Sequence, residues 1–305
     1  MPDAVVVNID ERTEFSFLAS DGAAVGRERP LPSLRRVRPS AATSALRWGS
    51  GAADVVLAHG AALNAHTWDS TLLAWAGRDD FLALDLPGHG DSPWRADADY
   101  SPAALAPALE DSLAAAAASG WTVARPALVG HSLGGLIALQ CIRDPQPGFG
   151  RLVLVDILPL APEAARTVAS FLDGPTSFAS REEIVERALA FGLGGGSRAK
   201  LERGVFLNTR ISPDGHVIWK HHFGQLGGRA MAGHGSDLLW EAIAHSDVPI
   251  DLVVASQSIV DAETLDRFTA LRPGARVVRV SGSHNLQETS PVELAQVLQR
   301  LVAAG

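Results

Sequence analysis

The stretch Pro126–Gly135, PALVGHSLGG, decides the fold. Its apolar start leads into Gly130-His131-Ser132-Leu133-Gly134, and an apolar, helix-like run, LIALQCI, follows Gly135. A strand, a sharp turn and a helix in this order place a serine hydroxyl above the end of a sheet, with backbone N–H groups beside it. Glycines flank the serine because side chains there would collide across so tight a turn. The pattern predicts that Ser132 is an exposed nucleophile on a strained turn.

Short apolar segments separated by helix-length segments surround this turn. Arg35–Trp48 has the length of one or two strands, and Ser101–Ser119 predicts a helix with Ser101 as its N-cap. Runs of this kind, covered by helices on both faces, are typical of a mostly parallel, doubly wound α/β sheet. The predicted buried strands are Asp54–Ala58, Phe81–Leu84, Ala127–Gly130, Arg151–Asp156, Ile250–Ala255 and Ala275–Val280.

The spacing of these strands predicts three parts of the chain. Residues 1–34 are turn-rich and are interpreted as an N-terminal extension, with room for an edge strand. Residues 35–156 and 249–305 form the α/β core, and residues 157–248 form an inserted helical cap without a buried strand. The amphipathic helices expected in the cap are Ala161–Phe171, Ser180–Phe191, Arg198–Asn208 and Ser236–His245.

Composition excludes several classes of partner. The 305 residues carry a net charge of −8, which argues against a nucleic-acid partner, and the cluster Arg35–Arg38 is interpreted as a solvated strand edge. Cys141 is the only cysteine, and no apolar run approaches the ~20 residues that span a bilayer. We therefore expect a cytoplasmic protein that binds a small molecule and no membrane; the sequence leaves a homodimer open.

A serine hydroxyl needs a base and an oxyanion site. His284 follows the last predicted strand, so it should reach the same sheet edge as Ser132, because parallel strands end together. The N–H of Leu133, at the start of the helix after the serine, is one expected oxyanion donor. The N–H of Ala61 is the other, in the small-residue loop that follows an earlier strand.

Several segments together resemble the α/β-hydrolase fold family. They are LAHG, LDLPGHGDS, LVGHSLGG, LVLVD and SGSHNLQETSP, in the family's order. The resemblance implies a triad in the order serine, acid, histidine, with Ser132 as nucleophile and His284 as base. It also implies that Ala61 and Leu133 supply the oxyanion donors, and that Asp85 and His89 have supporting roles.

The acid is where this chain departs from the family pattern. The family's usual place for it follows the strand after the cap, where this sequence has Ser258 and Ile259. Asp261 comes two or three residues later, in a position suited to capping a helix. Asp156, at the end of the strand after the serine, is favoured because it should lie on the correct edge. The sequence leaves open Asp156, Asp261 or no acid at all.

No metal or cofactor is predicted. His221 and His222 are adjacent and should point apart, and His216 and His234 have no ligand spacing, although they could line a pocket. A serine nucleophile argues against epoxide or haloalkane chemistry, which uses an aspartate in this family. The sequence thus predicts a serine hydrolase acting on a small to medium apolar carboxylic ester or lactone. Cleavage of a carbon–carbon bond in a diketone, or ligand binding without catalysis, are the alternatives.

The cap supplies the apolar residues on which this substrate prediction depends. Most of them should form the cap's own core, and a few should face the pocket. They are Leu158, Leu160, Phe171, Phe178, Phe191, Phe206, Trp219, Phe223, Met231 and Trp240.

Overall fold

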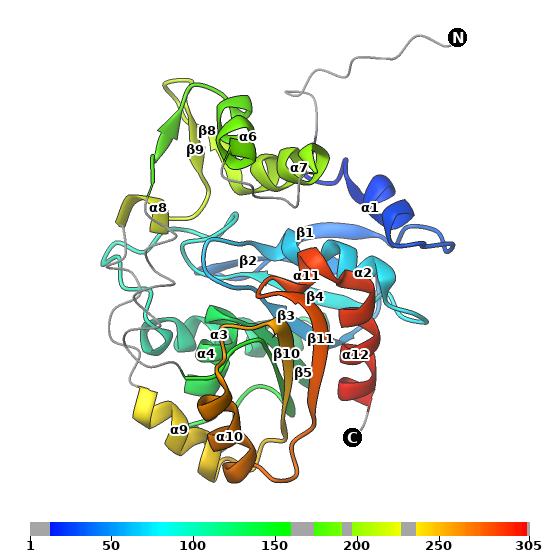
Figure 1. Ribbon diagram of the computed structural model, residues 1–305, viewed down its shortest axis with the longest axis vertical. Coiled ribbons are helices and arrows are strands. Elements are labelled where there is room, and N and C mark those ends of the chain that lie inside the picture. The colour runs from blue at the N-terminus through cyan, green and yellow to red at the C-terminus, as the bar shows by residue number, and fades with distance from the viewer. Residues whose placement is uncertain (1–12, 160–173, 191–196, 227–235, 304–305) are drawn as a thin grey trace.

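The computed structural model describes residues 13–159, 174–190, 197–226 and 236–303. Its centre is an eight-stranded sheet in the order β1-β2-β4-β3-β5-β6-β10-β11 (Figure 1). β1 and β2 pair antiparallel, as do β2 and β4, and every later pair is parallel. The strands are β1 Leu34–Ser40, β2 Thr43–Trp48, β3 Ala53–Ala58, β4 Phe81–Asp85, β5 Thr122–His131, β6 Arg151–Val155, β10 Ile250–Gln257 and β11 Val277–Ser283.

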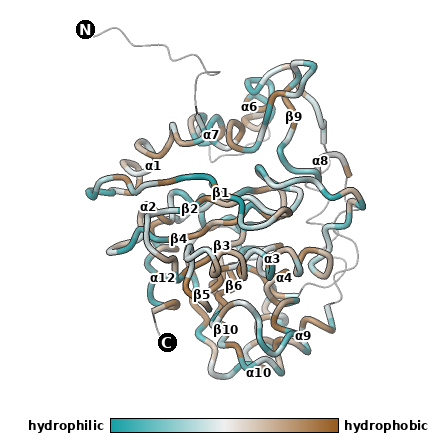
Figure 2. The backbone as a smooth tube through the Cα atoms, turned by 180° about the vertical axis from the view of Figure 1, so that it is seen from behind, coloured by the Kyte–Doolittle hydropathy of each residue, from teal (hydrophilic) through white to brown (hydrophobic). Residues whose placement is uncertain are grey.

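Helices cover both faces of this sheet, which explains why its central strands are apolar throughout. One buried cluster joins the sheet to α3, α4, α9 and α10, and the other joins it to α1, α2 and α12. Figure 2 shows the apolar colours on β3, β5 and β6, whereas the edge strand β1 is hydrophilic. These helices and two short neighbours are α1 Leu18–Ala24, η2 Ala65–Trp68 (a 3-10 turn), α2 Asp69–Ala74, α3 Pro102–Ala118, α4 Leu133–Cys141, α9 Ser236–His245, α10 Ala262–Leu271, α11 Leu286–Thr289 and α12 Pro291–Ala303.

The cap region contains strands that the sequence did not indicate. β7, β9 and β8 form a small antiparallel sheet beside α6 and α7, at the top of Figure 1. The sequence expectation was a cap without a buried strand, and these three strands are short and partly exposed; strands of two or three residues cannot show an alternating pattern. These elements are β7 Ser177–Phe178, α6 Arg181–Ala190, α7 Arg198–Asn208, β8 Thr209–Ile211, β9 Val217–Trp219 and α8 Phe223–Leu226.

Several sequence expectations are confirmed and others corrected. The helices predicted at Arg198–Asn208 and Ser236–His245 form as expected, whereas the one at Ala161–Phe171 lies outside the described residues. In the N-terminal part, no strand forms in the described residues 13–33, where α1 forms and buries Leu18 against the core; the edge strand β1 begins at Leu34. The division into extension, core and cap stays a prediction.

Among the residues that the structure describes, no helix is long and apolar enough to cross a membrane.

Candidate active site

Ser132 occupies the sharp turn between β5 and α4. Its backbone has φ 49° and ψ −117°, a conformation that side-chain-bearing residues seldom adopt and that stores strain. A Cβ on Gly130 would lie 2.7 Å from the Cα of Gly135, and one on Gly134 would lie 2.5 Å from the carbonyl oxygen of Ala58. The glycines are thus required at these positions, as the sequence predicted.

The loop after β3 lies against the serine. A Cβ added to Gly60 would come within 3.0 Å of the Cβ of Ser132 and 2.7 Å of His131 Nδ1. Gly134 N–H donates to the His59 carbonyl at 3.0 Å, which ties this loop to the first turn of α4. The predicted donors Ala61 and Leu133 therefore belong to two backbone segments held against each other beside Ser132. Leu133 opens α4, where the first N–H groups lack intrahelical acceptors.

Asp156 and His284 form a direct pair. His284 Nδ1 lies 2.8 Å from Asp156 Oδ2, although the two residues are 128 positions apart. Asp156 directly follows β6 and its side chain is fully buried, whereas His284 directly follows β11 and is 23% exposed. With Nδ1 bound to the carboxylate, Nε2 is the imidazole nitrogen that can exchange a proton with a neighbouring hydroxyl.

The other oxygen of Asp156 accepts two further hydrogen bonds. The Ala255 N–H donates to Oδ1 at 2.7 Å, and the Ser258 hydroxyl donates to the same atom at 2.5 Å. Three donors from β10, its following turn and the His284 loop therefore surround one buried carboxylate. Such charge-assisted hydrogen bonds stabilise an anion that burial alone would disfavour.

Asp261, the other acid left open by the sequence, has a different contact. Its Oδ1 accepts the Thr264 N–H at 2.7 Å and caps the start of α10, and this hydrogen bond lowers the pKa of its carboxyl group. Of the two aspartates, the structure thus brings Asp156 to His284. The catalytic roles themselves stay predictions.

His131 belongs to the site, but the sequence analysis assigned it no role. Its Nε2 donates to the His284 carbonyl at 3.0 Å, and its ring centre lies 4.7 Å from that of His284. Gln287 Nε2 approaches the opposite nitrogen, Nδ1, at 3.4 Å. Burial lowers the pKa of His131 well below its ordinary value, so the ring is neutral and can donate from one nitrogen while accepting on the other. His131 occupies the first variable position of the G-x-S-x-G motif, so the motif itself did not indicate this role.

Asp85 and His89 hold backbone segments in place, which fits the supporting roles that the resemblance implied. Asp85 accepts the backbone N–H of Ala65 at 2.7 Å and that of Asp91 at 3.0 Å. His89 is fully buried, and its Nδ1 contacts the Pro87 carbonyl at 3.0 Å. These bonds connect the end of β4 to the loops around it.

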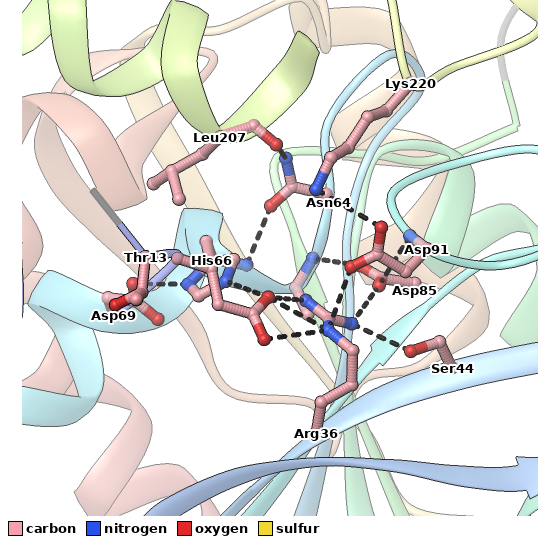
Figure 3. A network of polar contacts seen from close by, with 12 residues as sticks. Thr13, Arg36, Ser44, Asn64, His66, Asp69, Asp85, Asp91, Leu207 and Lys220 are labelled. Carbon is pink, nitrogen blue, oxygen red and sulfur yellow. Dashed lines mark hydrogen bonds and ion pairs between the residues drawn. The ribbon is translucent and has the colours of Figure 1, made fainter. Parts of the chain in front are cut away.

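Figure 3 shows a polar network beside these loops. His66 Nδ1 lies 2.9 Å from Asp69, its Nε2 lies 3.2 Å from Glu14, and Arg36 contacts both Glu14 and Asp85 at 2.6 Å. The interpretation of the Arg35–Arg38 cluster as a solvated edge is therefore wrong for Arg36, because β1 turns this side chain toward the buried Asp85 and the partly buried Glu14.

The cap joins the same network through α7. Arg203 reaches Asp21 of α1 at 2.7 Å and Asp69 of α2 at 2.9 Å. We call Glu14, Asp21, Arg36, His66, Asp69 and Arg203 the clasp, since they join the N-terminal part, the core and the cap. Asn64 adds a second link to the cap, because its Nδ2 donates to the Leu207 carbonyl at 3.1 Å.

The apolar side chains expected in the cap have mixed surroundings. Phe178 and Trp219 pack edge to face at 5.5 Å in the cap, and Phe206 packs against Phe17 at the same distance. Leu158, Phe223 and Trp240 join the core cluster around α4. The remaining members of the set, Leu160, Phe171, Phe191 and Met231, lie outside the described residues.

The adjacent histidines His221 and His222 pack against tryptophan rings away from Ser132. His221 stacks on Trp219 at 5.4 Å, and His222 stacks on Trp94 at 4.4 Å, so the two adjacent rings do point to different partners. His216 lies in the turn between β8 and β9, and His234 lies outside the described residues. Within the described part of the chain, no cluster of three histidine, cysteine or acidic side chains could hold a metal ion.

The strained serine, the buried acid–histidine pair and the sheet order define a class of protein. A model of the alpha/beta hydrolase family matches residues 55–297, and the chain belongs to that family. The predicted fold class and family are thereby confirmed.

Among individual proteins, the chain is similar to the esterase Rv0045c of Mycobacterium tuberculosis, with 34% identity over 94% of each chain. The crystal structure of that esterase matches with a TM-score of 0.82 and 31% identity, covering 96% of this chain and 99% of the other. The crystal structure of E-2-(acetamidomethylene)succinate hydrolase matches at a TM-score of 0.73 and 22% identity, covering 90% of this chain and all of the other, which supports the fold alone.

Proposed function

We propose that this chain is a serine esterase that cleaves a small to medium, largely apolar carboxylic ester or lactone through an acyl-enzyme. The observation that carries the proposal is the Asp156–His284 pair at 2.8 Å beside the strained Ser132 turn. Similarity to a full-length esterase supports the same reaction class.

The reaction has two steps. Ser132 Oγ attacks the ester carbonyl while His284 Nε2 takes the hydroxyl proton, and Asp156 stabilises the resulting imidazolium. The N–H groups of Leu133 and Ala61 stabilise the oxyanion of the tetrahedral intermediate, and the imidazolium then protonates the departing alcohol. In the second step water attacks the acyl-enzyme, with His284 again acting as base, and the acid product leaves Ser132 free.

The proposal includes a cytoplasmic location, a small-molecule substrate and no nucleic-acid or membrane partner, while a homodimer is left open. Its support is the acidic net charge and the single cysteine, Cys141, which is buried in α4. Burial raises the pKa of the Cys141 thiol well above its ordinary value, so this residue is unsuited to act as a competing nucleophile.

Intact-mass labelling with a fluorophosphonate tests the proposal, together with hydrolysis of a short p-nitrophenyl ester. Wild type should gain one label rapidly and hydrolyse the ester, whereas Ser132→Ala should do neither and keep the circular dichroism spectrum of wild type. Ester hydrolysis retained by Ser132→Ala would reject the assignment. A wild-type protein that binds the ester but neither reacts nor turns over would favour ligand binding without catalysis.

A further inference from the structure

We propose that Ser258 is a positioning residue for the acid–histidine pair, holding the Asp156 carboxylate in the orientation that serves His284. The inference rests on the proposed function, and it assigns a task to the position where family members usually carry the acid. Ser258 directly follows β10 and is partly buried. Its hydroxyl contacts the carboxylate and not the imidazole.

The direction of the Ser258 hydroxyl is set by two hydrogen bonds. Its oxygen accepts the Val260 N–H at 2.9 Å, two residues along the chain, as in a serine turn. Its single proton is then directed to Asp156 Oδ1 at 2.5 Å. Val260 is itself buried in the core, so the turn that carries the hydroxyl is anchored.

This contact distinguishes the two oxygens of the carboxylate. Ala255 N–H and the Ser258 hydroxyl both donate to Oδ1, which leaves Oδ2 directed at His284 Nδ1. The two donors lie on β10 and in the turn after it, so they restrain rotation of the carboxylate about its last torsion. Without the hydroxyl, Oδ1 keeps one donor and the carboxylate can rotate away from the imidazole.

This restraint would preorganise the Asp156 carboxylate for its hydrogen bond with His284. An acid that holds the catalytic histidine in one tautomer and orientation contributes to each proton transfer. Loss of one charge-assisted hydrogen bond to that acid should therefore appear in kcat, whereas KM should change little. The acid limb of the kcat/KM profile should also move to lower pH, because the His284 imidazolium would lose part of the stabilisation that the Asp156 carboxylate provides.

The test compares Ser258→Ala, Ser258→Thr and Ser256→Ala. Ser256 is the matched control, because its hydroxyl hydrogen-bonds the backbone of Gly282 at 3.0–3.2 Å and not Asp156 or His284. We expect Ser258→Ala to lower kcat on a p-nitrophenyl ester roughly tenfold, a size typical of one such hydrogen bond. Its kcat/KM profile should shift toward lower pH, Ser258→Thr should restore both properties, and Ser256→Ala should leave the profile in place.

A second readout separates this inference from the proposed activity. The low-field NMR resonance of the His284 Nδ1 proton reports its pairing with Asp156 whether or not an ester is cleaved. That signal should be present in wild type and in Ser258→Thr, and broadened or shifted in Ser258→Ala. An unchanged signal, or a Ser258→Ala variant with wild-type kcat and pH profile, would overturn the positioning role. An inactive wild type with the expected NMR changes would reject the esterase proposal alone.

Discussion

At the scale of single residues, the site depends on a few backbone positions that only certain side chains tolerate. Ser132 and Asp156 both have positive φ, 49° and 51°, on the same edge of the sheet. Aspartate tolerates this region better than most residues, and the nucleophile turn imposes it on serine. Two of the four non-glycine residues with positive φ in the described chain are thus residues that the proposed reaction uses.

Asp156→Asn should lower kcat by about three to four orders of magnitude. A neutral amide does not stabilise an imidazolium as a carboxylate does, and its NH2 group facing Nδ1 would hold the imidazole in the wrong tautomer. Asp261→Asn is the control and should cost less than about threefold, because Asp261 only caps α10. Steady-state kinetics of both variants decide the matter, and a reversed pattern would exclude Asp156 as the acid.

Gly60→Ala should lower kcat about a hundredfold or more. The added methyl would lie 2.7 Å from His131 Nδ1 and 3.0 Å from Ser132 Cβ, so the oxyanion loop must shift. Gly204→Ala is the matched control, since nothing lies within 4 Å of its added methyl in α7. That control should retain activity and gain about 0.5–1 kcal/mol in unfolding free energy. Wild-type kinetics in Gly60→Ala would show that the loop does not serve the oxyanion.

At the scale of elements, sequence predicted what is local and missed what depends on contacts between distant segments. The Ser132 turn could be predicted because its glycines and flanking strand and helix are contiguous. The choice between Asp156 and Asp261 required the pairing of β6 with β10, which places Asp156 beside Ala255 and Ser258. The short cap strands and α1 likewise take their structure from packing partners that no local pattern shows.

The residues that follow β6 and β10, Asp156 and Ser258, contact each other beside His284. An acid at the second position should therefore partly replace an acid lost from the first. In Asp156→Ala/Ser258→Asp, a carboxylate would extend from the position after β10 into the space that the Asp156 side chain leaves. We expect this double variant to recover at least tenfold of the kcat lost by Asp156→Ala alone. Kinetics of the single and double variants measure the recovery. No recovery would mean that the turn after β10 cannot direct an acid to His284.

At the scale of the whole molecule, the clasp joins three parts of the chain through buried and partly buried charged side chains. Burial by itself lowers the pKa of His66, but the Asp69 carboxylate opposes it and raises the pKa to about 9. Burial likewise raises the pKa of Glu14, but hydrogen bonds from His66 and Arg36 outweigh it and lower the pKa to about 2. His66 and Glu14 are therefore both charged at neutral pH.

This charge predicts a pH-dependent stability. Because the folded-state pKa of His66 lies above its ordinary 6.5, its contribution is complete below pH 6.5 and is lost as pH rises through about 9. His66→Gln should therefore remove up to about 3 kcal/mol of the fall in unfolding free energy between pH 6.5 and 9. Urea unfolding at several pH values measures this difference, with the exposed His245→Gln as control. Parallel curves for wild type and His66→Gln would contradict the prediction.

The clasp also sets an order of events during synthesis. Asp21 leaves the ribosome long before its partner Arg203, which follows 182 residues later. Leu18 of the same helix belongs to a cluster that also contains Leu294 and Leu298 of α12, so that cluster is complete only once α12 has emerged. Helix α1 can therefore pack against α2 early, but its ion pair with Arg203 forms only after α7 has emerged, so the docking of α1 is completed late.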